Sequence, residues 1–314
     1  MRPWLAIPLL MSACIPEFPD VAEPCGTWPE PGLYDLTIDM PDKKRKALIE
    51  IGPSTGPRDL VVAIHGGGQN PKEFLNNLRF SPLLDSGDEP LVVAYPQGRK
   101  TWFWRMWNAG PCCGTIDEDH RDALDVEFLD ALVKELESRA CVDRTLATGF
   151  SNGGMMAMRW ACEGTTPDAV MVAAGPLLTE SCVGDPLPMR AYHGTADDTV
   201  PIEGGEAPVR GSSYPPAEKG WAMWRERNEC VDVVAESFEY GPMTCVRYAE
   251  CVEATEVCTI EGWGHLWPGG RNANKLESNA TSEALTFLRT SVPRKRDPGQ
   301  TDFSVDDTSD TGTP

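Results

Sequence analysis

Short apolar runs recur along the chain, and most of them stop at or near a glycine or a proline. They cover 59–64, 90–96, 145–149, 169–175 and 189–194. A continuous apolar run of this length is typical of a strand that is buried on both faces of a sheet. Between the second and third runs lies 122–139, whose apolar residues recur at helical spacing. This alternation predicts the α/β class, with a mostly parallel central sheet and helices on both faces.

Further elements are expected outside this alternating region. They are a hairpin of edge strands within 34–51, a helix at 217–228, strands at 245–248 and 256–260, and a helix at 282–290 capped by Thr281 and Ser282. No internal repeat is visible, so these elements are expected to complete one domain.

The N-terminal residues resemble a signal peptide, with a charged start and an apolar run too short to span a bilayer. Ser12 and Ala13 precede Cys14, as small residues do at a bacterial lipoprotein cleavage site, so Cys14 is expected to be lipidated. The protein is therefore expected to be secreted or anchored in the cell envelope. The expected organisation is a signal peptide at 1–14, a linker at 15–31, a folded domain at 32–292 and a disordered acidic tail at 293–314.

The composition is acidic and rich in cysteine. The chain of 314 residues has a formal net charge of -20, which argues against a nucleic-acid partner because phosphate binding needs clustered Lys and Arg. Lipidation of Cys14 would leave ten of the 11 cysteines, an even number that favours disulfides in an oxidising compartment. A zinc site is the alternative, but the cysteine spacings do not repeat in the Cys-x-x-Cys manner. We expect a disulfide-stapled monomer without a metal.

A Gly-x-Ser-x-Gly motif, formed by Gly149, Ser151 and Gly153, follows the apolar run at 145–149 and leads into a helical segment. In a nucleophile elbow, glycines two residues before and after the serine allow a strained strand-to-helix turn. An ordinary glycine-rich turn is the alternative interpretation of the motif alone. Ser151 is the candidate nucleophile.

A serine nucleophile needs a histidine as base and a carboxylate that orients this base, in the chain order serine, acid, histidine. Of the four histidines, His193 and His265 follow Ser151, and His265 lies in a glycine-rich loop after a predicted strand. We therefore predict His265 as the base and Asp197 as the acid. Asp198 is the competing carboxylate, and His193 is interpreted as a structural turn residue whose ring binds the backbone.

An acyl-transfer site also needs backbone N–H donors for the oxyanion. The amide of Asn152, directly after the nucleophile, is one candidate donor. The second is expected from Gly67 or Gly68, in the glycine loop that follows the apolar run at 59–64. His65, which begins this loop, is interpreted as structural.

Several motifs in this order resemble the extracellular polyhydroxybutyrate depolymerase and feruloyl esterase group of α/β-hydrolases. They are His65-Gly66-Gly67-Gly68-Gln69, Tyr95-Pro96-Gln97-Gly98, Trp107-Asn108 before Cys112-Cys113, Cys141-Val142-Asp143, Thr148 to Met155, His193 to Asp197, and Gly264 to Gly270. The resemblance implies an α/β-hydrolase fold, carboxylic-ester hydrolysis, and Ser151, Asp197 and His265 as the catalytic residues. The implied substrates are phenolic or acetyl esters of plant walls, or 3-hydroxyalkanoate polyesters.

Disulfide pairs are expected in connection with this resemblance. Cys25 and Cys141 are expected to pair with the adjacent Cys112 and Cys113, and the other expected pairs are Cys162 with Cys182, Cys230 with Cys251, and Cys245 with Cys258. Trp102, Trp104, Trp107 and Trp267 are candidates for an aromatic substrate pocket, with packing in the core or in a lid as the alternative for the first three.

The sequence thus predicts a secreted serine esterase that hydrolyses feruloyl or acetyl esters of plant polysaccharide through an acyl-enzyme, without a cofactor. Polyhydroxybutyrate depolymerisation is the nearest alternative. A non-catalytic binding lipoprotein is an alternative of another class, and a peptidase of the same fold is a third.

Overall fold

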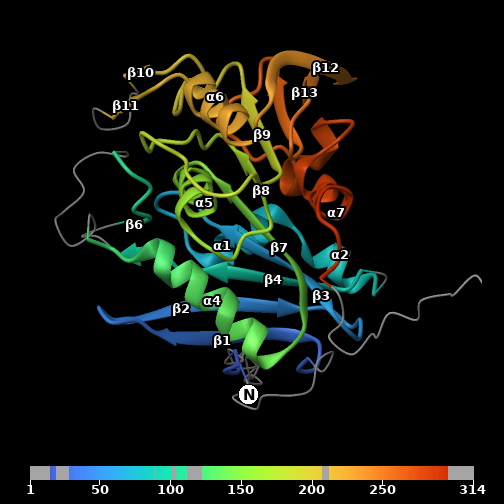
Figure 1. Cartoon of the computed structure of the whole chain (residues 1–314). Helices are drawn as coiled ribbons and strands as arrows, with labels where there is room; N and C mark the ends of the chain where they lie inside the picture. Colours follow the sequence, from blue (N-terminus) through green and yellow to red (C-terminus); the bar gives the residue numbers. More distant parts are fainter. Residues whose placement is uncertain are drawn as a thin grey trace, which may run out of the picture.

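A computed structural model of the chain describes residues 15–18, 28–87, 89–100, 104–111, 122–206 and 212–295. Its main strands are β1 (Gly32–Asp39), β2 (Lys44–Ile51), β3 (Arg58–Ile64), β4 (Leu91–Pro96), β7 (Val142–Phe150), β8 (Ala169–Ala173), β9 (Met189–Gly194), β12 (Val231–Tyr240), β13 (Met243–Ala249) and β14 (Thr255–Ile260). They form one sheet in the order β1-β2-β4-β3-β7-β8-β9-β14-β13-β12 (Figure 1). Two small hairpins, β5 (Arg99–Lys100) with β6 (Arg105–Met106) and β10 (Gly205–Glu206) with β11 (Ser213–Tyr214), lie outside it.

The middle of the sheet is parallel and its two margins are antiparallel. The parallel pairs run from β4 through β3, β7, β8 and β9 to β14. At one margin β1 and β2 are antiparallel, and at the other β13 and β12 are. This is the predicted mostly parallel sheet of the α/β-hydrolase fold.

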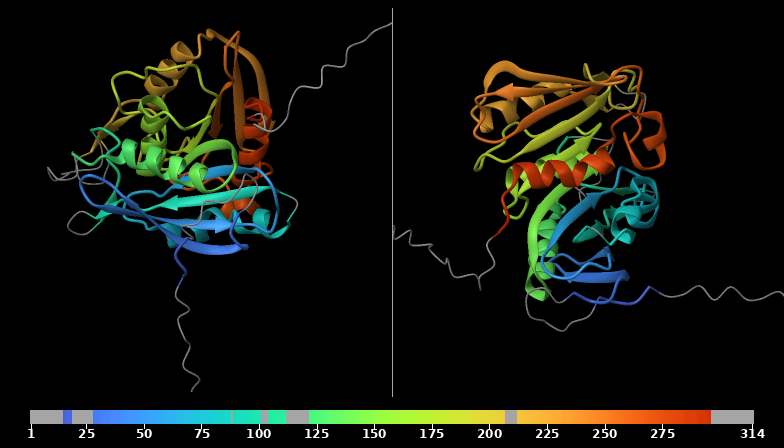
Figure 2. Two further views of the ribbon diagram at one scale, coloured as in Figure 1. Left: turned by 60° about the horizontal axis from the view of Figure 1, so that its bottom comes forward. Right: turned by 90° about the vertical axis from the view of Figure 1, so that its right-hand side faces the viewer.

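Helices cover both faces of the sheet (Figures 1 and 2). They are α1 (Pro71–Leu78), α2 (Ser81–Asp85), α4 (Asp125–Arg139), α5 (Asn152–Glu163), α6 (Ala217–Arg227) and α7 (Ala280–Ser291), with a 3-10 helix, η1 (Gly270–Lys275). Buried side chains of α4, α5 and α6 belong to one hydrophobic cluster, and those of α1, α2 and α7 belong to a second. The α7 helix is capped by Asn279, whose side chain accepts from the amide of Ser282 at 3.1 Å. The expected cap by Thr281 and Ser282 was therefore wrong.

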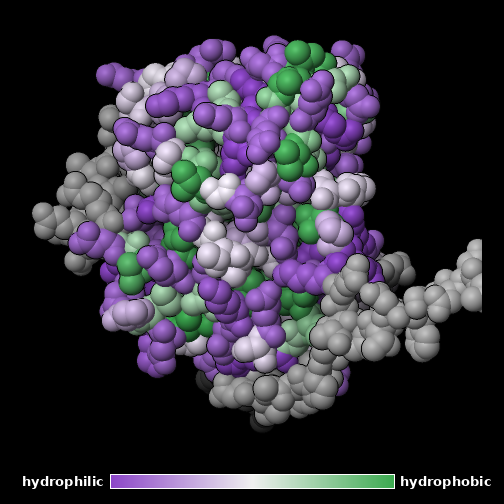
Figure 3. Space-filling model, viewed as in Figure 1, coloured by the Kyte–Doolittle hydropathy of each residue, from purple (hydrophilic) through white to green (hydrophobic). Residues whose placement is uncertain are grey.

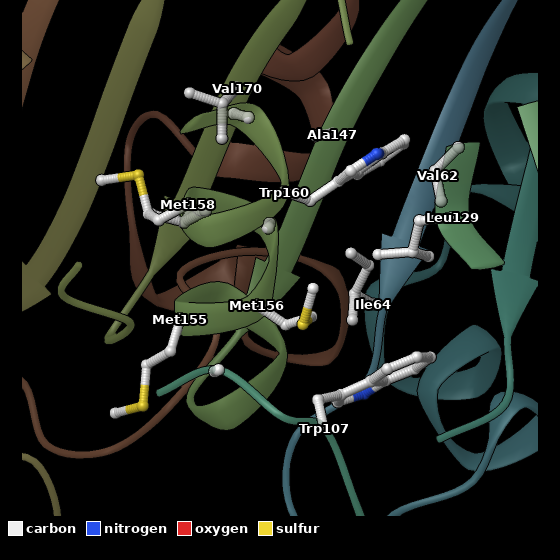
Figure 4. Close-up of a cluster of buried hydrophobic side chains, with 14 of the residues drawn as sticks. Val62, Ile64, Trp107, Leu129, Ala147, Met155, Met156, Met158, Trp160 and Val170 are labelled. Carbon is white, nitrogen blue, oxygen red and sulfur yellow. The ribbon is translucent and has the colours of Figure 1, made fainter. Parts of the chain in front are cut away.

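The central strands carry both cores because their residues alternate between the two faces. Leu60, Val62 and Ile64 of β3 lie in the cluster under α4 and α5, which Figure 4 shows in part. Val61 and Ala63 of the same strand lie in the opposite cluster. All seven residues of β3 are buried, which explains the continuous apolar run in the sequence.

The edge strand β12 was not predicted from the sequence. Most of its residues are exposed, including Val231, Val233 and Val234. A small hydrophobic group lies on the otherwise largely hydrophilic face of Figure 3, at the top, where Figure 1 places β12. A strand with little burial on either face has no clear period-two pattern, so its sequence gives little signal.

The described disulfides join cysteines that are 13 to 21 residues apart. The structure has the bonds Cys162–Cys182, Cys230–Cys251 and Cys245–Cys258, and the last of these crosses the β13 and β14 pair. Cys141 is also disulfide-bonded. Its expected partner, Cys112 or Cys113, lies outside the described residues, and so do Cys25, which was expected to pair with the other of these two, and Cys14.

The expected signal peptide at 1–14, residues 19–27 of the expected linker and residues 296–314 of the expected tail lie outside the described residues. Residues 15–18 of the expected linker belong to the fold instead, because Pro16 and Phe18 bond to the backbone of Asp35 and Phe18 is buried. Within the described part of the chain, no helix combines the length and apolar character needed to cross a bilayer.

Candidate active site

Ser151 lies at a sharp turn between β7 and α5. Its backbone has φ 55° and ψ -129°, an unusual conformation for a residue with a side chain. A methyl group on Gly149 would collide with the carbonyl oxygen of Gly153, and one on Gly153 would collide with that of Ile64. The two glycines of the motif are therefore required by close backbone packing, and the turn has the geometry of a nucleophile elbow.

The side chains of His265 and Asp197 complete a continuous hydrogen-bonded chain with Ser151. His265 Nε2 lies 2.9 Å from Ser151 Oγ, and His265 Nδ1 lies 2.7 Å from Asp197 Oδ2. The three residues follow β7, β9 and β14, so they meet at the carboxyl edge of the parallel strands. The imidazole also packs against the ring of Phe150, with centroids 4.7 Å apart.

The buried Asp197 carboxylate is held in its ionised form. Burial raises its pKa, but the hydrogen bond and charge of His265 and the amides of Val200 and Thr199 outweigh this, so the pKa lies below the ordinary value. Asp197 Oδ1 accepts from these amides at 2.8 and 2.9 Å. The competing Asp198 is exposed, and its side chain accepts from Thr199 Oγ1 at 3.3 Å.

His193 and His65 are buried and bind the backbone. His193 Nε2 lies 2.8 Å from the carbonyl oxygen of Val200, and burial lowers the pKa of its ring. His65 Nδ1 lies 2.8 Å from the carbonyl oxygen of Gly66, and its Nε2 accepts from the amide of Gly98 at 3.0 Å. Burial lowers the pKa of His65 to about 4, so its ring is neutral at pH 7.

Of the two glycines expected to supply an oxyanion donor from the loop after β3, Gly67 and Gly68, only Gly67 has an N–H that is available within the described residues. The N–H of Gly68 donates to the carbonyl oxygen of Arg105 at 2.8 Å, so Gly68 was wrong as an oxyanion donor. In the described part of the chain, the N–H of Gly67 has no acceptor. A methyl group on Gly67 would lie 3.7 Å from Cβ of Asn152, which places this glycine beside the N-terminus of α5.

Two of the tryptophans proposed for the substrate pocket, Trp107 and Trp267, are buried instead, and Trp102 lies outside the described residues. Trp107 is fully buried, with its Nε1 donating to the carbonyl oxygen of His65, and Figure 4 shows it in the core cluster with Ile64. Trp267 is 5% exposed, and its Nε1 donates to Thr281 Oγ1 at 2.9 Å. The pocket assignment was wrong for both because their indoles are used in packing.

Two exposed hydrophobic residues lie beside the site. Trp104 is among the tryptophans proposed for the pocket, whereas Leu266 was not assigned to it from the sequence. Trp104 is 46% exposed and packs over Gly68, where an added methyl group would lie 2.7 Å from its ring. Leu266, directly after His265, is 43% exposed. Exposure is a property of the folded chain, so the sequence alone did not separate Trp104 from the buried tryptophans.

No three His, Cys, Asp or Glu side chains of the described residues come together in a group that could hold a metal ion.

Comparisons with known proteins find relatives among esterases. No protein-family model matches the chain. "Feruloyl esterase B" of Piromyces equi is 31% identical over 247 residues, which are 73% of this chain and 41% of the relative. NocK of Nocardia uniformis subsp. tsuyamanensis, also named as an esterase, is 30% identical over 237 residues, which are 68% of this chain and 66% of the relative. The matches thus span less than two thirds of the length of either curated relative.

A solved structure, the acetyl xylan esterase from Aspergillus awamori, superposes with a TM-score of 0.57. The superposition covers 77% of this chain and 97% of that protein at 15% sequence identity. At this level of identity the likeness shows the shared fold, and it agrees with the α/β-hydrolase strand order.

Proposed function

We propose that the protein is a carboxylic ester hydrolase that uses Ser151 as its nucleophile. The observation that carries this proposal is the hydrogen-bonded chain from Ser151 Oγ through His265 to Asp197, with distances of 2.9 and 2.7 Å. The relatives named as esterases support the same reaction class.

In the proposed acylation step, His265 Nε2 takes the proton of Ser151 Oγ as this oxygen attacks the ester carbonyl carbon. The tetrahedral intermediate then collapses, the bond to the alcohol oxygen breaks, and His265 returns the proton to the leaving alcohol. A water molecule then attacks the acyl carbon while His265 takes one of its protons. The bond from the acyl carbon to Ser151 Oγ breaks, His265 returns the proton to this oxygen, and the acid is released. Asp197 stays ionised throughout and stabilises the imidazolium, in agreement with its lowered pKa.

The oxyanion of each intermediate is proposed to accept from the amides of Gly67 and Asn152. Asn152 is the first residue of α5, where the helix dipole favours negative charge. Gly67 lies against its Cβ and has an uncommitted N–H within the described residues. Two such donors stabilise charge that develops only in the transition state.

For the substrate, we propose feruloyl or acetyl esters of plant polysaccharide. The name of the Piromyces relative supports the feruloyl group. Trp104, directly before β6, supplies an exposed aromatic surface against Gly68, and Leu266 supplies an aliphatic one beside the base. Such surfaces suit the planar ring of a phenolic acyl group.

For the location, we propose export to an oxidising compartment, with lipid attachment at Cys14 as the anchor. The disulfides of the described domain support an oxidising environment. Metabolic labelling with a fatty-acid analogue, compared between the natural chain and Cys14→Ser, tests the anchor.

The proposed function is tested by hydrolysis of methyl ferulate, acetylated xylan and 3-hydroxybutyrate oligomers, with Ser151→Ala as the control. We expect hydrolysis of the first two substrates and its loss in Ser151→Ala. Preference for the oligomers would replace the substrate proposal with a polyester depolymerase. Amide cleavage in preference to ester cleavage would indicate a peptidase, and inactivity on every substrate would favour a binding protein.

A further inference from the structure

The side chain of Asn152 makes an unusual pair of contacts with the main chain of a distant residue. Its Oδ1 accepts from the N–H of Trp107 at 2.8 Å, and its Nδ2 donates to the carbonyl oxygen of Trp107 at 3.1 Å. Both residues are buried. The side chain thus binds the segment after β6 to the first residue of α5.

The same segment is also bound to the glycine loop. Trp107 Nε1 donates to the carbonyl oxygen of His65 at 2.9 Å, and the carbonyl oxygen of Arg105 accepts from Gly68 N–H at 2.8 Å. Met106 packs on the face of Gly67, where an added methyl group would lie 2.8 Å from its sulfur. Residues 105–107 therefore contact the loop on both sides of Gly67.

We infer that the Asn152 side chain is a positioning residue for the oxyanion hole, acting through residues 105–107. This inference rests on the proposed function and adds a role for the side chain of a residue whose amide is a proposed donor. The two donor amides belong to different parts of the chain, Asn152 to the first turn of α5 and Gly67 to the loop after β3. The side-chain contacts with Trp107 link the two elements and fix the distance between the two donors.

The effect of the link falls on the transition state. A donor that is misplaced by a fraction of an ångström still permits substrate binding but stabilises the oxyanion less. Loss of the link should therefore lower kcat and leave KM nearly unchanged. It should also weaken binding of a boronic acid, which forms a tetrahedral, negatively charged adduct with a serine nucleophile.

A matched control, Asn228, lies near the amino ends of the parallel strands, whereas the proposed site lies at their carboxyl ends. Asn228 is also buried, and its Oδ1 accepts from the N–H of Leu187 at 3.0 Å while its Nδ2 donates to the carbonyl oxygen of Leu187 at 2.9 Å. It lies after α6, and Leu187 precedes the first residue of β9 by two positions, away from the carboxyl edge. Asn228→Ala removes the same pair of contacts, together with a 2.8 Å hydrogen bond from Nδ2 to Thr255 Oγ1, without touching the proposed site.

The test compares Asn152→Ala, Asn152→Asp and Asn228→Ala by melting temperature, kcat and KM for methyl ferulate, and affinity for phenylboronic acid. Asn152→Asp keeps the acceptor for Trp107 N–H, loses the donor and places a carboxylate where the α5 dipole favours it, so it decides the case if Asn152→Ala does not fold. We expect all variants to melt lower than the natural protein. We expect both Asn152 variants to lose about ten- to a hundredfold in kcat and in boronate affinity, with KM within about twofold of the natural value. The expected loss of kcat is smaller than the loss on removing a whole oxyanion donor.

Asn228→Ala is expected to keep kcat and boronate affinity within about twofold of the natural protein. Folded Asn152 variants with natural kcat and boronate affinity would overturn the inference, and so would an equal loss of kcat in Asn228→Ala. Neither result would affect the proposed function, which is tested separately by ester hydrolysis in the natural protein and its loss in Ser151→Ala.

Discussion

His193 Nε2 lies 3.7 Å from Asp197 Oδ2, the oxygen that also accepts from His265. The same nitrogen lies 2.8 Å from the carbonyl oxygen of Val200, so it carries the proton and donates to Val200. The Val200 amide in turn donates to Asp197 Oδ1 at 2.8 Å. His193 therefore supports the turn that orients the Asp197 carboxylate.

Replacing His193 should disturb this turn. In His193→Ala the buried carbonyl of Val200 loses its donor, which costs about 1–3 kcal/mol of stability. The Asp197 carboxylate becomes less well oriented, so kcat should fall about tenfold with little change in KM. Steady-state kinetics and urea unfolding check both effects. His193→Gln, which can donate to the same carbonyl, should recover part of kcat. A folded His193→Ala with natural kcat would show that the turn at 197–200 keeps its conformation without His193.

Because His65 is buried and neutral, we expect the free energy of unfolding to fall in acid. Its pKa is about 4 in the folded protein and 6.5 as the ordinary value. Below pH 6.5 the unfolded chain binds a proton that the folded protein does not, so this contribution is complete above pH 6.5 and is lost as the pH falls toward 4. The loss attributable to His65 is about 3 kcal/mol at most.

This prediction is checked by urea unfolding of the natural protein and His65→Gln at pH 7 and pH 4. The free energy of unfolding should fall more steeply with acid in the natural protein, by about 3 kcal/mol or less. His193 has the same sign of shift and is present in both proteins, so it cancels in the difference. Parallel pH dependence of the two proteins would contradict a neutral buried His65.

The glycines of the elbow should not tolerate a methyl group. In Gly149→Ala the added carbon would collide with backbone atoms of Gly153, which cannot move without shifting α5. We expect a loss of more than about 3 kcal/mol in the free energy of unfolding, or failure to fold. Gly264→Ala is the control, because its added methyl group would meet nothing closer than the carbonyl oxygen of Ala196 at 3.8 Å. Equal melting temperatures of the two variants would contradict the packing argument.

Trp104 should favour aromatic acyl groups. Trp104→Ala should lower kcat/KM for methyl ferulate about tenfold, equivalent to about 1.4 kcal/mol, and affect an acetyl ester much less. Trp104→Phe should retain most of the preference because it keeps a flat ring. An equal loss on both esters would mean that Trp104 supports the loop rather than the substrate.

The mostly parallel sheet and the candidate residues of the site could be predicted because each had a strong local signal. The runs at 59–64 and 145–149 are mostly apolar or small because they are buried on both faces, and they became parts of β3 and β7. Ser151, Asp197 and His265 were selected by the glycine pattern and the chain order, and the structure brings these three side chains into contact.

Other features depend on contacts that no local pattern records. Gly67 and Gly68 are equivalent in the sequence, and only contacts of the folded chain distinguish them, namely the bond from Gly68 N–H to Arg105 and the place of Gly67 beside Asn152. Trp104 and Trp107 are three residues apart, yet one is exposed and the other fully buried. The side chain of Asn152 binds a residue 45 positions away. These relationships are set by tertiary packing and were therefore missed or wrong.

The central claim, that Ser151 attacks an ester carbonyl, is tested most directly by covalent labelling. The folded protein is incubated with a fluorophosphonate, digested and analysed by mass spectrometry, with Ser151→Ala and His265→Ala in parallel. The account predicts a single adduct on Ser151 in the natural protein, none at this position in Ser151→Ala, and labelling slowed by a factor on the order of a thousand in His265→Ala. An unlabelled Ser151 in folded protein, or labelling at the natural rate without His265, would contradict it.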